Sequence, residues 1–335
     1  LKTRFGNLGN ILDFENLTKD NIHVLESPIL SNSQFAKFTE FFKNNLKVLD
    51  CTFDVQNNLK KRLDQLCSEA EIAVREGCKH LILSDKKISE KKATIPMILA
   101  LGAINSKLVN LGIRGFVSIN VQTGEVLDTH SFAVLLGIGA TIINPYLAFD
   151  SIYQRYEKKL FGKFSYEECI QRYIKSVDNG LLKIMSKMGI SVLSAYRGGC
   201  NFETVGLSRA IVAEYFPGMI SRISGIGIFG IEAKIKELHK KAFQKNVSIL
   251  PIGGIYKYRK NGENHQYQGQ LIHMLQHAVS TNSYEIYKKY VQGIYNLPTI
   301  NLRDLLAFKK LGKRININEV ESVDSLRKRF GSGSM

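Results

Sequence analysis

The sequence predicts an α/β fold, a mainly parallel sheet with flanking helices, and two observations support it. Between residues 46 and 146, short β-branched stretches alternate with longer segments whose apolar residues recur at helical spacing. Such alternation implies right-handed βαβ crossovers, which place neighbouring strands parallel. The chain has 335 residues, of which 44% are hydrophobic and 10% aromatic. It is therefore long enough to bury the core of one large domain or two ordinary ones.

The first elements follow in order along the chain. Residues 1–35 hold two Gly-Asn turn sites and an extended X-Pro element that ends at the helix cap Ser31. Strands are expected at 46–53, 79–84, 116–121 and 140–144. Helices are expected at 56–76, 95–111 and 130–137, and from Tyr146 onward. Pro96 suits the first turn of the second helix, where a missing N–H costs nothing.

A long helix is expected to follow Ser165, with Glu168 at the capping-box position, and to end at Gly189. The β-branched run 190–193 is typical of a short buried strand. A polar, glycine-rich turn at 194–199 follows it, and Asn201 could cap a short helix to Leu207. At the carboxyl edge of an open sheet, such a turn would lie where ligands bind.

The last third of the chain differs in composition from about residue 245. A basic amphipathic helix at 232–243 precedes this change. Residues 251–268 alternate tyrosine with basic residues and contain Asn261-Gly262, which together predict a β-hairpin. Aromatic and basic interleaving also occurs in RNA-binding proteins, although cross-strand pairing is the simpler interpretation. Helices are expected at 270–279 and 283–295.

Literal strings in this sequence resemble the large subunit of glutamate synthase, in the same order and over essentially the whole chain. They include MSKMGIS at 185–191, FETVGL at 202–207, SRISGIG at 221–227 and NLRDLL at 301–306. The resemblance implies three parts: residues 1–35 connect from an absent glutaminase domain, 36–245 form the central α/β domain, and 246–335 begin the FMN-binding synthase domain. The last part would lead, through the hairpin and helices, into an incomplete (β/α)8 barrel.

The resemblance also implies a function for the longer protein, which makes two glutamates from glutamine, 2-oxoglutarate and a reductant. This chain would be the scaffold between its glutaminase and FMN sites, inactive alone. The implied cofactors are FMN and a 3Fe-4S cluster, neither expected on this chain except through Ser334 and Met335, which match a flavin-contacting string. The implied partners are the glutaminase and FMN domains of the same chain, and a small subunit or ferredoxin as electron donor.

No catalytic or metal-binding residue is assigned. Leu1 stands where a terminal cysteine nucleophile would be needed, and Ile255 replaces an acidic residue that the resemblance implies. His130 opens a helix, but a structural histidine is the simpler interpretation. Asp85 and Asn144, at strand ends, are expected to bond turn backbone, and Asp128 near Ser131 does not by itself make a triad.

Composition limits the other possibilities. The five cysteines form no CxxC pair, which argues against a disulfide scaffold and a zinc site and fits a reducing compartment. The expected compartment is the cytoplasm, or the plastid stroma if the resemblance is to a plant-type source. The net charge of +16 suggests nucleic acid, but the lysines are dispersed and no nucleic-acid module is present. No apolar run is long enough for a membrane span. Two alternatives stay open: a stand-alone module for a small anion or nucleotide, and a basic RNA-associated protein.

Overall fold

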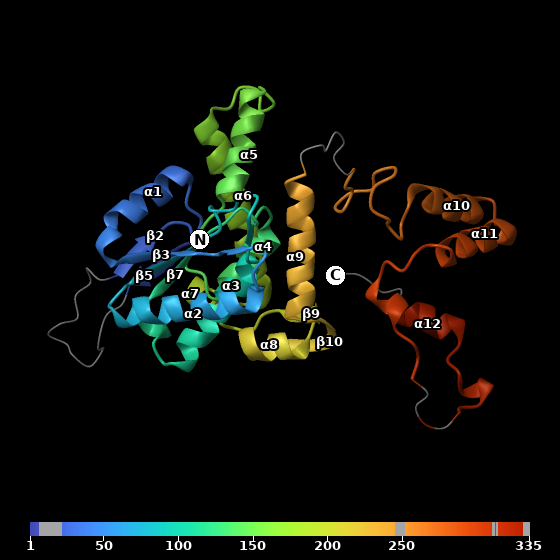
Figure 1. The fold of residues 1–335 in the computed structure, drawn as a ribbon. Helices are drawn as coiled ribbons and strands as arrows, with labels where there is room; N and C mark the ends of the chain where they lie inside the picture. Colours follow the sequence, from blue (N-terminus) through green and yellow to red (C-terminus); the bar gives the residue numbers. More distant parts are fainter. Residues whose placement is uncertain (7–21, 245–251, 310–311, 313, 331–335) are drawn as a thin grey trace. The chain divides into compact units, whose positions relative to one another are not determined.

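Figure 1 shows the computed structural model of the chain, which describes residues 1–6, 22–244, 252–309, 312 and 314–330. The chain divides into two compact units, Leu1–Lys245 and Asn246–Met335. Within the described ranges, no helix is both long and apolar enough to cross a membrane.

A four-stranded parallel sheet lies at the centre of the first unit (Figure 1). Its strands, in spatial order, are β3 (Leu46–Asp50), β5 (His80–Ser84), β7 (Ser118–Gln122) and β8 (Ile142–Asn144). The register pairs Asp50 with Ser84, Ser84 with Gln122, and Gln122 with Asn144. The predicted α/β fold is thus confirmed. In this register, each of the four strands ends in a polar residue, and the four lie side by side at the same edge of the sheet.

Helices cover both faces of this sheet, because successive residues of a strand point to opposite sides. Leu81 and Leu83 of β5 belong to the large core, which includes residues of α2 (Leu59–Arg75), α3 (Met97–Asn110) and α4 (Thr129–Ile138). Ile82 packs instead in a smaller cluster with Phe5 of β1 (Thr3–Gly6) and two phenylalanines of α1 (Asn32–Phe41).

The described parts of residues 1–35 pack within the first unit. Strand β1 pairs antiparallel with β2 (Ile22–Leu25), and Ile29 bridges to Ile143 at the edge of the sheet. Ser31 caps α1 with a complete capping box, which confirms the predicted helix start. That this range connects to a preceding domain stays a prediction.

The rest of the first unit surrounds this core. Its elements are β4 (Thr52–Asp54), β6 (Lys92–Thr94), α5 (Tyr146–Glu157), α6 (Tyr166–Met188), α7 (Leu193–Tyr196), β9 (Glu203–Leu207), α8 (Arg209–Tyr215), β10 (Ile220–Ile226) and α9 (Ile228–Ala242). Helix α6 has the predicted capping box of Ser165 and Glu168, and it ends at Gly189, which adopts a left-handed conformation.

Two predictions between residues 190 and 207 are wrong. Instead of a strand at 190–193, a helical turn, α7, begins at Leu193, because Leu193 and Tyr196 are both buried at helical spacing. Instead of a helix, residues 203–207 form the strand β9, which pairs in parallel with β10. Gly206 has a φ of +80°, outside the helical region.

The second unit consists mainly of α10 (Gly269–Ser280), α11 (Tyr284–Tyr295) and α12 (Val323–Phe330). The predicted hairpin is wrong over the described residues 252–268, which form turns without a strand. The turn at Asn261 does form, with a φ of +63°, but Tyr256 is 88% exposed, so flanking strands would have no core to cover. Passage into an incomplete (β/α)8 barrel stays a prediction, because residues 252–309 and 314–330 contain no strand.

Candidate functional site

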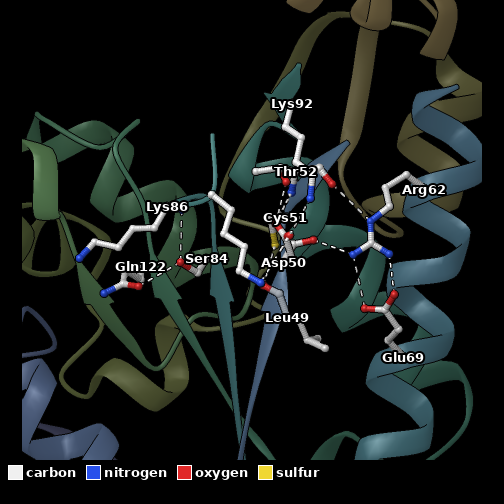
Figure 2. Close-up of polar contacts among 11 residues, drawn as sticks. Leu49, Asp50, Cys51, Thr52, Arg62, Glu69, Ser84, Lys86, Lys92 and Gln122 are labelled. Carbon is white, nitrogen blue, oxygen red and sulfur yellow. Dashed lines mark hydrogen bonds and ion pairs between the residues drawn. The ribbon is translucent and has the colours of Figure 1, made fainter. Parts of the chain in front are cut away.

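The carboxyl edge of the parallel sheet gathers polar side chains that hydrogen-bond in a row. The Ser84 hydroxyl donates to Gln122 Oε1 (2.9 Å), and Gln122 Nε2 donates to Asn144 Oδ1 (3.2 Å). Figure 2 shows the first of these bonds. Asn144 Nδ2 in turn donates to the carbonyl oxygen of Leu30 (3.0 Å), as expected for a residue that bonds turn backbone. Each amide is therefore fixed in orientation by its neighbours.

Asp85, directly after β5, holds the turn that follows β7. Its carboxylate accepts hydrogen bonds from Thr123 Oγ1 (2.6 Å) and from the backbone N–H of Gly124 (3.0 Å). The side chain is buried. This confirms the prediction that Asp85 bonds turn backbone, and a carboxylate so engaged is unsuited to act as a general base.

The end of β3 is fastened to helix α2 by Arg62 (Figure 2). Its guanidinium donates to the carbonyl oxygens of Asp50 (2.7 Å) and Thr52 (3.3 Å) and pairs with Glu69 (2.5 Å). The Asp50 carboxylate accepts from the backbone N–H (3.1 Å) and hydroxyl (2.7 Å) of Thr52. Lys87 and Lys92 lie 3.8 Å from its other oxygen. Both carboxylates at this corner thus have cationic partners.

The thiols of Cys51, at this edge, and of Cys67 and Cys78, elsewhere in the first unit, are unsuited to nucleophilic chemistry. Cys51 is fully buried, and burial, with Asp85 and Asp50 nearby, raises the pKa of its thiol far above the ordinary value. Burial likewise raises the pKa of Cys67 to about 11 and raises that of Cys78. A thiol with such a pKa is protonated near neutral pH and is a poor nucleophile or metal ligand.

A site for the implied iron–sulfur cluster is not found among the residues that the structure describes. No three His, Cys, Asp or Glu side chains there come together as metal ligands. Because such a cluster is held mainly by cysteine thiolates, these residues do not fit it. Ser334 and Met335, the residues matched to a flavin-contacting string, lie outside the described residues.

Asp128, His130 and Ser131, around the start of α4, do not form a triad. Asp128 is the N-cap, and it accepts from both the backbone N–H (2.9 Å) and the hydroxyl (2.7 Å) of Ser131. The hydroxyl is therefore bonded to the carboxylate. His130 is exposed, with its ring edge-on to Phe202 at 6.2 Å between centroids.

Sequence reasoning missed an apolar groove beside His130. Its volume is about 380 Å³, and its lining includes residues of α3, α4, β9 and α8. Sequence reasoning also missed Arg62 and Gln122, because their bonding partners at the sheet edge come from other segments of the chain. The position of Arg62 near the start of a helix that follows a strand is a weak local signal that it could bond the end of that strand.

Comparisons of the sequence with a family model and with curated proteins agree on one family. The family model of the glutamate synthase central domain matches residues 1–208. The glutamate synthase [NADPH] large chain of Azospirillum brasilense is 47% identical over 98% of this chain and 22% of its own length. That of Bacillus subtilis is 38% identical over 93% and 20%, and the chloroplastic ferredoxin-dependent glutamate synthase of Spinacia oleracea is 34% identical over 100% and 22%. The chain thus spans about a fifth of the length of these relatives.

Proposed function

Because the chain belongs to the glutamate synthase family through its central domain, we propose that it is the scaffold between the glutaminase and FMN sites of a longer glutamate synthase. One observation carries the proposal. A relative is 47% identical over 98% of this chain, while the match covers 22% of that relative. A match over about a fifth of the relative, together with the match to the central-domain family model, favours a structural piece of a larger enzyme.

The carboxyl edge of the sheet supports a positioning role. Ligands of open α/β folds usually bind at this edge. Here the polar side chains Ser84, Gln122 and Asn144 bond to one another, and Asp85 is engaged by a turn. An edge whose polar side chains are bonded within the fold in this way is suited to holding other domains in place. Because these side chains are bonded to one another, they are not available to a ligand, which disfavours the alternative of a stand-alone module for a small anion or nucleotide.

In this proposal, the longer protein converts glutamine, 2-oxoglutarate and a reductant into two glutamates. FMN and the 3Fe-4S cluster would be bound by parts of the protein outside the described residues, and no step is assigned to a residue of this chain. The proposed electron donor is either a small subunit, bringing electrons from NAD(P)H, or ferredoxin, because relatives named for NADPH and for ferredoxin both match. The proposed compartment is the cytoplasm or the plastid stroma.

The test compares the two half-reactions in the full-length protein. The purified chain of 335 residues should show neither glutaminase nor flavin-dependent activity.

In the full-length protein, loosening the scaffold with Asp85→Asn should raise the ratio of glutamine hydrolysed to 2-oxoglutarate consumed above one. The exposed Asp150→Asn serves as the control and should leave this ratio unchanged. Turnover by the isolated chain, or loss of both half-reactions together, would contradict the scaffold.

A further inference from the structure

Strands β9 and β10 form a parallel sheet of only two strands. Parallel strands are normally found in larger sheets with both faces covered, and a pair alone is marginally stable. Here α8 connects the two strands, and α9 follows them (Figure 1). Val205 of β9 is still 45% exposed and Ile220 of β10 is 55% exposed. The pair therefore has the character of an incomplete sheet.

Among the described residues, β9 pairs with β10 along one edge only, and the apolar groove borders β9. It is lined by the consecutive residues Glu203, Thr204 and Val205, and also by Met219, which precedes β10, and Ile231 of α9. An edge strand presents unpaired backbone N–H and C=O groups, so the groove borders a row of hydrogen-bonding positions.

The opposite wall and the floor of the groove are apolar. The start of α3 contributes Ile98 and Leu99, α4 contributes Val134 and Ile138, and Phe216 follows α8. His130 is among the few polar residues of the lining. A backbone edge next to an apolar trough is the arrangement that binds an extended peptide: the main chain pairs with the strand, and alternate side chains enter the trough.

We propose that β9 pairs along this edge with an extended segment of the same polypeptide that lies outside residues 1–335, and that its alternate apolar side chains fill the groove. The inference rests on the proposed function, because it needs the longer protein. The relatives are about five times the length of this chain, so most of such a protein lies outside the part that corresponds to residues 1–335. A third strand would also cover Val205 and extend the two-stranded sheet.

Hydrogen exchange tests the added strand directly. The backbone amides of residues 203–207 should exchange at least about tenfold more slowly in the full-length protein than in the chain of 335 residues, because paired edge amides are protected. Amides of β5, buried inside the other sheet, serve as the internal control and should exchange alike in both proteins. Equal rates for β9 in the two proteins would overturn the inference.

A photo-crosslinker identifies the occupant. p-Benzoylphenylalanine replaces Val205 in the full-length protein, and in a matched control it replaces Tyr153 of α5, which is 48% exposed and not part of the groove. The Val205 product should be one peptide from outside residues 1–335, absent from the control. A crosslink to residues 1–335, to a second copy, or to nothing would contradict the proposed occupant.

The two proposals fail separately. If the isolated chain turns over substrate, the scaffold function is wrong whatever the exchange rates of β9 are. If the chain is inactive and β9 exchanges equally in both proteins, only the strand-docking inference is lost.

Discussion

Asp85 is the single residue whose loss should disturb the carboxyl edge most. It is 3% exposed, and its carboxylate accepts from the Thr123 hydroxyl and the Gly124 N–H. In Asp85→Asn, the amide oxygen can replace Oδ2, which accepts both bonds, but the amide nitrogen then faces the Gly124 N–H, which lies 3.2 Å from Oδ1, and both bonds lose their charged acceptor. We expect the free energy of unfolding to fall by about 2 kcal/mol, the usual loss for a hydrogen-bonded charged group. Urea titration at neutral pH measures it.

Asp150→Asn is the matched control, because Asp150 lies on α5 and is exposed. Its effect should stay within about 0.5 kcal/mol, as is usual for surface substitutions. Equal losses for the two variants would show that the Asp85 turn adds nothing specific to the fold.

His80 should make the first unit sensitive to acid. It is 2% exposed, and its ring packs against Phe42 with centroids 4.3 Å apart. Burial, with a smaller effect from the charges of His23 and Lys79, lowers the pKa of His80 to about 4. The unfolded chain has the ordinary pKa near 6.5, so it takes up the proton first as the pH falls. Stability from His80 is complete above pH 6.5 and is lost toward pH 4.

The expected loss between pH 7 and pH 5 is about 2 kcal/mol for this one group. His80→Leu removes the titration, so the difference in unfolding free energy between wild type and variant should shrink or reverse at pH 5 relative to pH 7. Urea titrations of both proteins at both pH values measure it. Parallel pH profiles would mean that His80 is protonated as easily in the folded protein as in the unfolded one.

At the scale of elements, α9 holds the start of α2 in place through one carboxylate. Glu232 accepts from the backbone N–H of Leu59 (2.8 Å) and pairs with Lys236, which donates to the carbonyl oxygen of Asn57 (3.0 Å). The first N–H groups of a helix have no partner within it, so Glu232 supplies one. Glu232→Ala should lower the free energy of unfolding by about 1–2 kcal/mol.

The same helix provides the control for this prediction. Glu237 pairs with Lys241 at 2.6 Å, but both side chains are more than half exposed, at 63% and 64%. Exposed pairs of this kind contribute little, so Glu237→Ala should cost no more than about 0.5 kcal/mol. Glu232→Gln keeps an acceptor and should restore most of the stability. Thermal or urea unfolding of the three variants decides between packing and capping as the role of Glu232.

Elements with local signals were predictable from the sequence, and elements that depend on distant partners were not. The capping box of Ser165 and Glu168 and the stop at Gly189 place α6 correctly because all three act within the helix. Strand β9 was predicted as a helix because its partner β10 begins 13 residues after β9 ends, and nothing local indicates the pairing. The hairpin failed for the opposite reason: its turn formed, but no core lay beneath its strands.

Residues of the candidate site likewise divide into those with a local signal in the sequence and those whose partners are distant. Asp85 and Asn144 were assigned correctly as backbone-bonding residues because each stands at a strand end, whereas the role of Asp128 as a helix N-cap was not predicted. The bond from Ser84 to Gln122 joins residues 38 positions apart and could not be read from either one. A network across adjacent strands becomes visible only when the register is known.

At the scale of the whole molecule, the two units should differ sharply in their ability to fold alone. Both core clusters are built from residues of the first unit. Among the described residues of the second unit, the buried apolar ones are Leu271 and Ala278, while Tyr295 is 84% exposed and Phe330 is 77% exposed. About 90 residues with so little buried apolar surface cannot offset the conformational entropy of ordering the chain.

We therefore expect a protein ending at Lys245 to unfold in one cooperative urea transition, and a protein of residues 246–335 to show none. Helices α10 and α11 pack on each other and should leave partial helical circular dichroism in the second protein, without a sharp thermal midpoint. Cooperative unfolding of 246–335 would mean that it has a core of its own. Loss of the transition in 1–245 would mean that the sheet depends on the residues removed. Either result would change where the boundary between the folding units belongs.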